Sequence, residues 1–163
     1  MTQVSPSRYS YMKPLAIALA GVALVTPLFL PQNEPLDAPA LKALIEGLGY
    51  PTKNLSEEKG KEKYEFQIKT DGFNIPIAGE ISASKNYIWF TVFLGEPPKD
   101  ANRHTALLKE NQKVQPNFFY ITDKGSLMLA VAVDNRGVTP AIVRRVTDKL
   151  SSDVGKTASV WQR

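Results

Sequence analysis

Apolar and polar residues alternate along several short stretches of this chain, and each stretch predicts a β-strand. The clearest alternation covers residues 64–69, where one face carries apolar side chains and the other face carries polar ones. An Asp-Gly pair, typical of a tight hairpin, separates this strand from a second one, in which Pro76 and Gly79 predict a bulge or a bend. Residues 87–94 are apolar on both faces, as is expected of a central strand. The five predicted strands are residues 64–69, 73–81, 87–94, 118–121 and 127–133.

Apolar residues recur every three to four positions in three other stretches, which predicts amphipathic helices. The first helix begins after Asp37, whose side chain can cap it, and ends before Gly49, which suits the left-handed conformation that follows many helices. The second covers residues 101–114 and can be capped by Asp100, and the third begins at Pro140 with Thr139 as its cap. The predicted buried positions of the second and third helices are Ala106, Leu107, Leu108, Val114, Ile142, Val143, Val146, Leu150 and Val154.

The order of the predicted elements is α-β-β-β-α-β-β-α, and this order defines the expected fold. Consecutive strands that are joined by short turns are antiparallel. We therefore expect an α+β fold, with an antiparallel five-stranded sheet and with the helices packed on one face. The charged stretch at residues 52–63 is predicted to be a solvated loop. The domain is expected to cover residues 38–163, after a linker at residues 32–37.

A continuous apolar run precedes the expected domain and predicts an N-terminal hydrophobic helix. It consists of Leu15, Ala16, Ile17, Ala18, Leu19, Ala20, Gly21, Val22, Ala23, Leu24, Val25, Thr26, Pro27, Leu28, Phe29 and Leu30. Arg8 and Lys13 precede the run and acidic residues follow it, which predicts a cytoplasmic N-terminus and export of the rest of the chain. Residues 1–31 are thus expected to be a signal peptide or an N-terminal membrane anchor. The retained anchor is favoured, because no small-x-small cleavage site closely follows the run.

The net charge gives little reason to expect a nucleic-acid partner. The formal net charge is +4, and Arg8 and Lys13 contribute two of these charges, since no acidic residue precedes residue 32. In the remainder the basic residues are spread thinly, and no basic stretch is interleaved with aromatic residues. Nucleic-acid binding needs a concentrated positive field, so we do not expect it.

The residue types present leave few kinds of catalysis open. There is no cysteine, which excludes disulfides and thiolate sites, and His104 is the only histidine. His104 is expected to face solvent near the start of the second helix. No phosphate-binding glycine motif occurs. We therefore expect neither an enzyme nor a cofactor, although a hydrolase whose carboxylates meet only in space stays open as an alternative.

Trp161 is the one aromatic residue with two predicted roles. It follows the last predicted helix in a short polar tail. A large apolar ring in such a tail suggests a contact, whereas a ring in the core is explained by packing alone. Either it docks back onto the sheet or it contacts a partner. Trp89, Phe90 and Phe93, in contrast, are expected to pack in the core.

The C-terminal part of the chain, PNFFYITDKGSLMLAVAVDNRGVTPAIVRRVTDKL, carries a resemblance to a known fold. Together with the element order, it resembles the type III secretion chaperone-like fold, and within it the YbjN-type bacterial family. The features that carry the resemblance are Phe118-Phe119, the turn at residues 123–125, the apolar strand after it and the helix that opens at Thr139-Pro140. The resemblance covers residues 38–154 and implies a non-enzymatic binding domain, often dimeric.

Taken together, these observations predict an exported protein-binding domain of the chaperone-like kind. It is expected to be membrane-anchored, or periplasmic or secreted if the leader is cleaved. The expected partner is a protein, with a homodimer as one option, bound through an open face or edge of the sheet. A domain that binds a small ligand or lipid in a pocket under the helices is the alternative.

Overall fold

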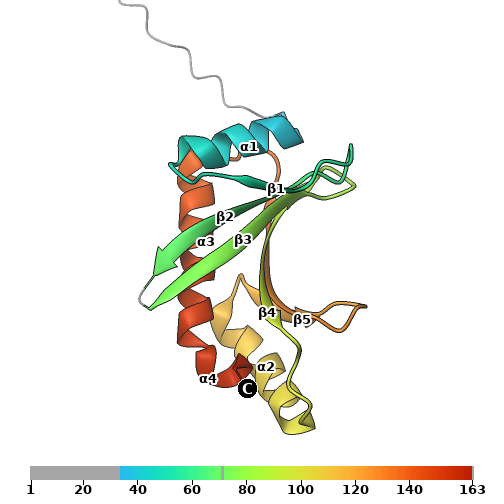
Figure 1. Cartoon of the computed structure of the whole chain (residues 1–163), viewed down its shortest axis with the longest axis vertical. Coiled ribbons are helices and arrows are strands. Elements are labelled where there is room, and N and C mark those ends of the chain that lie inside the picture. The colour runs from blue at the N-terminus through green and yellow to red at the C-terminus, as the bar shows by residue number, and fades with distance from the viewer. Residues whose placement is uncertain (1–33, 71, 163) are drawn as a thin grey trace, which may run out of the picture.

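A six-stranded antiparallel sheet forms the centre of the structure, a computed structural model that describes residues 34–70 and 72–162 (Figure 1). The strand order across the sheet is β1-β2-β3-β4-β6-β5. The strands are β1 (Lys53–Ser56), β2 (Lys63–Thr70), β3 (Phe73–Ile81), β4 (Tyr87–Gly95), β5 (Phe118–Ile121) and β6 (Leu127–Asp134). The helices are α1 (Ala38–Gly47), α2 (Ala101–Val114), α3 (Pro140–Lys156) and α4 (Ala158–Trp161).

The expected sheet of five strands is wrong by one strand, β1. This strand lies within the stretch that was predicted to be a solvated loop, and it pairs antiparallel with β2. Its sequence, KNLS, has no buried side chain, so it offers none of the apolar alternation by which a strand is found in a sequence. Main-chain pairing with β2 defines it instead. The antiparallel arrangement and the positions of the other five strands are confirmed.

The three predicted helix caps are confirmed. In each case a side-chain oxygen accepts a hydrogen bond from a backbone N–H in the first turn, which satisfies one of the donors left free at a helix start. The caps are Asp37, Asp100 and Thr139.

The hydrophobic core lies between one face of the sheet and the helices α1 and α3. Phe66, Ile77 and Phe90 point to this face from three neighbouring strands and are fully buried. The rings of Phe66 and Phe90 meet edge to face, with 6.3 Å between their centroids. Leu150 of α3 is also fully buried in this cluster. The position of α2 differs, because this helix packs against the edge strand β5 and against α4.

Gly79 allows close packing between the sheet and α1. A Cβ atom at this position would lie 3.3 Å from Cε1 of Phe90 and 3.4 Å from Cδ1 of Ile45. Of the bulge or bend that was predicted from Pro76 and Gly79, the bulge is absent, because the register between β2 and β3 is unbroken along all of β2. Tight packing therefore explains the glycine, and a bulge does not.

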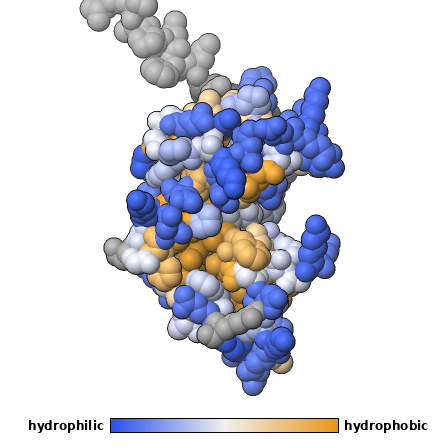
Figure 2. Space-filling model, in the orientation of Figure 1, coloured by the Kyte–Doolittle hydropathy of each residue, from blue (hydrophilic) through white to orange (hydrophobic). Residues whose placement is uncertain are grey.

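The strands β3 and β4 pair along only part of their length and then diverge (Figure 1). Pairing covers residues 78–81 of β3, although this strand begins at Phe73. Pro76 lies in the unpaired part, and proline has no N–H to donate to a neighbouring strand. Figure 2 shows apolar side chains gathered in this part of the molecule, where the two strands diverge above α2.

The first described residues are held against the far end of β6. Leu36 is buried, and its N–H donates to Oδ1 of Asn135 at 3.1 Å. The side-chain Nδ2 of Asn135 donates in turn to the carbonyl of Leu36 at 3.0 Å and to that of Lys85 at 2.9 Å. One buried amide thus joins the start of the domain to the turn between β3 and β4.

The predicted membrane segment, residues 15–30, lies outside the described residues. Within residues 34–70 and 72–162, no helix has both the length and the apolar character that a membrane crossing needs. Whether the segment is an anchor or a cleaved signal stays a prediction.

Candidate functional site

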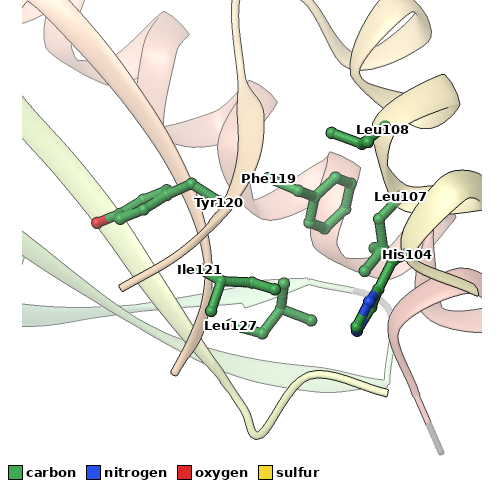
Figure 3. Close-up of a pocket in the computed structure, with 7 residues that line it drawn as sticks. All are labelled: His104, Leu107, Leu108, Phe119, Tyr120, Ile121 and Leu127. Carbon is green, nitrogen blue, oxygen red and sulfur yellow. The ribbon is translucent and has the colours of Figure 1, made fainter. Parts of the chain in front are cut away.

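An apolar pocket of about 210 Å³ lies between α2 and β5 (Figure 3). Its lining residues are His104, Leu107 and Leu108 of α2, Phe119, Tyr120 and Ile121 of β5, and Leu127 of β6. The pocket forms here because α2 crosses the end of the sheet without covering the whole of β5. Figure 3 shows the apolar side chains of both elements turned toward the same space.

The pocket has a buried floor and an exposed rim. Leu107, Phe119 and Leu127 are buried and form the floor. Leu108 and Ile121 form the rim, and they keep 70% and 46% of their surface exposed. These exposed aliphatic side chains around a concave apolar surface make the pocket the candidate site of the described residues, because water is readily displaced from apolar surface.

The exposure of Leu108 corrects a prediction from the sequence. Leu107 and Leu108 were both expected to be buried, but neighbouring residues on a helix point about 100° apart. Leu107 faces the sheet, so Leu108 points to solvent beside the pocket. Two adjacent leucines on an amphipathic helix cannot both face the sheet. The pair Leu107-Leu108 was therefore a sign that one leucine would be exposed.

His104 lines the pocket instead of facing solvent, so its predicted exposure is wrong. Its Nε2 atom is buried and has no hydrogen-bond partner among the described residues. The only other ionisable side chain of the lining is Tyr120, and Figure 3 shows its hydroxyl directed away from His104. The lining of the pocket is thus mainly apolar, without a carboxylate to orient the imidazole for catalysis.

The edge of β5 next to this pocket is closed by a side chain. The N–H of Phe119 donates to Oδ1 of Asn111 at 2.6 Å, and Nδ2 of Asn111 donates to the carbonyl of Phe119 at 3.3 Å. Both main-chain groups that a further strand would bind at this position are therefore occupied. The opposite edge strand, β1, is only four residues long, and its register with β2 is irregular.

Trp161 packs back against the domain at α3, whereas the docking predicted as one of its two roles was onto the sheet. Its indole N–H donates to the carbonyl of Val154 at 2.9 Å, and its ring packs against the core. Part of the ring stays exposed beside a groove that also includes Phe93. A contact between Trp161 and a partner stays a prediction.

Carboxylates do not form a catalytic pair in the grooves found here. Asp37 and Glu62 line one groove, near the start of α1. Asp37 caps that helix, and Oε2 of Glu62 accepts a hydrogen bond from the N–H of Gly60 at 2.8 Å. Each carboxylate therefore accepts a hydrogen bond from a nearby backbone N–H. Among residues 34–70 and 72–162, no group of three or more His, Cys, Asp or Glu side chains could hold a metal ion.

The fold and the pocket define an α+β domain with an apolar recess at one end of its sheet. No family model matches the chain, and no curated protein matches it. The chain is similar to one in the structure of the heterodimeric ExoU-SpcU complex from the type III secretion system of Pseudomonas aeruginosa. That similarity has a TM-score of 0.47 and 16% identity, and it covers 75% of this chain and 98% of that one.

The chain is also similar to one in the structure of the HopA1-SchA chaperone-effector complex. Here the TM-score is 0.48 and the identity 11%, over 71% of this chain and 88% of that one. Similarities at such low identity concern the fold and not the function. Membership of the YbjN-type family stays a prediction.

Proposed function

We propose that this protein is a non-catalytic protein-binding module, and that its α2–β5 pocket receives an apolar side chain of the partner. The observation that carries the proposal is the exposure of Leu108 and Ile121 around a buried apolar floor. A side chain that enters this pocket removes its own apolar surface and that of both rim residues from water. Such a central apolar anchor is typical of the residues that dominate binding energy at protein interfaces.

The size of the pocket favours a single side chain over a small-molecule ligand. Pockets for drug-sized ligands measure roughly 300–1,000 Å³. The pocket between α2 and β5 measures about 210 Å³, which is below that range.

The partner is proposed to bind through its side chains and not by adding a strand to β5. Asn111 already holds the N–H and the carbonyl of Phe119 on that edge. A strand that approached β5 would have to displace this amide first. The exposed side chain of Leu108 lies on α2 and can contact a partner without any change in the strand edge.

The proposed location is extracytoplasmic, with the domain tethered to the membrane by residues 15–30. The support is the apolar character of these residues and the basic residues Arg8 and Lys13 before them. The mature protein is then expected to retain the segment. An intact mass, measured on envelope material, that corresponds to a chain starting after residue 25 would overturn the tether and indicate a cleaved signal.

Photo-crosslinking at single positions tests the binding proposal. A photoreactive phenylalanine analogue replaces Leu108 in the full chain, in the cells that produce the protein. A second variant carries the analogue at Arg145, an exposed residue of α3, as the matched control. We expect a discrete protein adduct from position 108 and none from position 145.

The mass of the adduct also separates a homodimer from a complex with another protein. Adducts of equal yield from positions 108 and 145 would contradict the proposal, because binding would then not depend on the pocket. The absence of any protein adduct from position 108 would contradict it as well.

A further inference from the structure

The face of the sheet opposite α1 and α3 is rich in aromatic side chains. In β4 the residues that alternate with the buried Phe90 and Val92 point to this face. The register places the side chains of β5 that alternate with Phe119 on the same face. The aromatic residues of this face are Tyr87, Trp89, Phe93, Phe118 and Tyr120.

Three of these rings form a continuous row across the strands. The ring centroids of Trp89 and Phe118 lie 6.0 Å apart, and those of Phe118 and Tyr120 lie 5.9 Å apart. The strand between them, β6, contributes the small residues Ala130 and Ala132 to this face, so rings from both sides lean over it. Ala130 is fully buried as a result, although α1 and α3 pack on the opposite face of the sheet.

The charges on the part of this face that β3 to β6 form are acidic, whereas β2 adds Lys63, Lys69 and Glu65 to the same face. The strands β3, β4, β5 and β6 contain no lysine or arginine, and their carboxylates on this face are Glu80 and Asp134. Glu80 is the register partner of Trp89, and Asp134 is the register partner of Tyr87. Each carboxylate thus stands beside an aromatic ring. The Glu80 carboxylate also contributes, after burial, to a raised pKa of the Tyr120 phenol.

A lysine on the β2 part of this face already pairs with Glu80. The Nζ atom of Lys63, on β2, lies 3.0 Å from Oε1 of Glu80, and both side chains are about one-third exposed. Asp134 accepts the backbone N–H of Arg136 through Oδ1 at 2.8 Å. A cation from another molecule would therefore compete with Lys63 at Glu80.

We infer that this aromatic face, defined by Trp89, Phe118 and Tyr120 with Glu80 and Asp134, binds basic side chains of an extended protein segment. Aromatic rings attract cations through their negative faces, and a neighbouring carboxylate supplies the counter-charge. Arginine suits such a surface better than lysine, because its planar guanidinium stacks on rings and pairs with carboxylates at the same time.

The spacing on β4 specifies the segment further. Trp89 with Glu80 and Tyr87 with Asp134 form two ring–carboxylate pairs, and Trp89 and Tyr87 are two residues apart on one strand. This separation is about 7 Å along a strand, the distance between side chains at i and i+2 of an extended chain. The preferred segment therefore has basic residues at alternate positions.

Binding of a synthetic peptide tests the inference on the full chain in a neutral detergent. The probe is an octapeptide of alternating arginine and serine, and the control replaces each arginine with citrulline, which has the same shape without the charge. Calorimetry measures the dissociation constants, and the indole N–H signal of Trp89 reports contact with the ring. We expect the arginine peptide to bind and to shift this signal, and the citrulline peptide to do neither.

Two substitutions on one ion pair give opposite expected effects. Glu80→Gln removes the counter-charge without a change in shape and should weaken binding by at least about threefold. Lys63→Ala removes the resident competitor and should tighten binding. Leu108→Asp, at the α2–β5 pocket, should leave the affinity for the peptide unchanged, so failure of the pocket proposal and failure of this one are distinguishable.

Equal binding of the arginine and citrulline peptides would overturn the inference, and so would an unchanged affinity in Glu80→Gln. Vesicles of phosphatidylcholine provide a second cationic ligand, the quaternary ammonium of the lipid. Binding to these vesicles that depends on Glu80, without binding to the arginine peptide, would also overturn the assignment to a protein segment.

Discussion

The side-chain amide of Asn111 binds both main-chain polar groups of Phe119, accepting from the N–H at 2.6 Å and donating to the carbonyl at 3.3 Å. It does so on the outer side of β5, where a sheet would otherwise present an unpaired edge. The same two residues frame the floor of the α2–β5 pocket, because Phe119 lines it and Asn111 fixes α2 against the strand. One amide therefore closes an edge and positions the proposed binding surface.

Removal of this amide should both destabilise the domain and open its edge. Asn111→Ala breaks two partly buried hydrogen bonds, so we expect a loss of about 1–3 kcal/mol in the free energy of unfolding. The freed edge should also raise self-association. Urea titration and analytical ultracentrifugation measure the two effects, with Gln112→Ala, at the adjacent exposed position, as the control. An Asn111→Ala protein as stable and as monodisperse as the control would contradict this role.

Asn135 should be among the most sensitive polar positions of the domain. Its buried side chain makes hydrogen bonds to both main-chain groups of Leu36 and to the carbonyl of Lys85. Asn135→Ala leaves these groups without their partner, and we expect a loss of about 2–4 kcal/mol in the free energy of unfolding. Asn74→Ala removes a single exposed hydrogen bond, to Gln67, and should cost much less. Similar losses in the two variants would show that the junction at Leu36 is not a stabilising contact.

Two glycine substitutions should change stability in opposite directions. Gly79→Ala places a methyl group 3.3 Å from Phe90 and 3.4 Å from Ile45, and such overpacking typically costs about 1–3 kcal/mol. Gly47→Ala lies at the end of α1 with no atom within 4 Å of the new Cβ, and should add roughly 0.5–1 kcal/mol through the lower entropy of the unfolded chain. Thermal unfolding compares both with the unchanged protein. A Gly79→Ala protein as stable as Gly47→Ala would contradict the close packing of α1 on the sheet.

The ionisation of Tyr120 should report the charge of the aromatic face. Burial, and after it the Glu80 carboxylate, raise the pKa of this phenol above its usual value of about 10. Glu80→Gln should therefore lower the pKa of Tyr120 but leave it above that value, since burial persists. The difference in tyrosinate absorbance between each protein and its Tyr120→Phe counterpart isolates this residue. An unchanged pKa in Glu80→Gln would show that the carboxylate does not act on the ring.

The same shift has a consequence for stability at high pH. The folded state keeps the Tyr120 proton to a higher pH than the unfolded state, so the unfolded state loses its proton first. The contribution of Tyr120 to stability is therefore complete below pH 10 and is lost as the pH rises through the raised pKa. Tyr120→Phe should flatten this part of the stability profile, and the raised pKa of Tyr64 should account for part of the decline that remains.

The order of three helices and five strands could be predicted from the sequence because it depends on local patterns, whereas the short α4 was missed. Apolar periodicity and caps such as Asp37 and Thr139 act within a few residues, and both caps are confirmed. β1 could not be predicted, because its KNLS sequence has no buried face and only its pairing with β2 defines it. Because β1 pairs with β2, the edge strand on that side of the sheet is β1 and not β2.

The candidate site was not predicted, because it depends on how α2 is rotated against β5. Leu107 and Leu108 are both apolar, and periodicity alone does not decide which of them faces the sheet. The position of His104 in the pocket follows from the same rotation, since it lies one helical turn before both residues. The aromatic face was missed for a related reason: Trp89 and Phe93 were assigned to the core, whereas α1 and α3 pack on the other side of the sheet.

Crosslinking at position 108 should first identify the partner. The affinity of the purified partner for this protein then tests the proposed function most directly. Calorimetry with the full chain compares the unchanged protein, Leu108→Asp, and Ala141→Asp, which adds the same charge at an exposed position of α3. A carboxylate at the rim of the apolar pocket should weaken binding at least about tenfold, and the one on α3 should leave it within about twofold. Equal affinities for the two aspartate variants would contradict binding through the α2–β5 pocket.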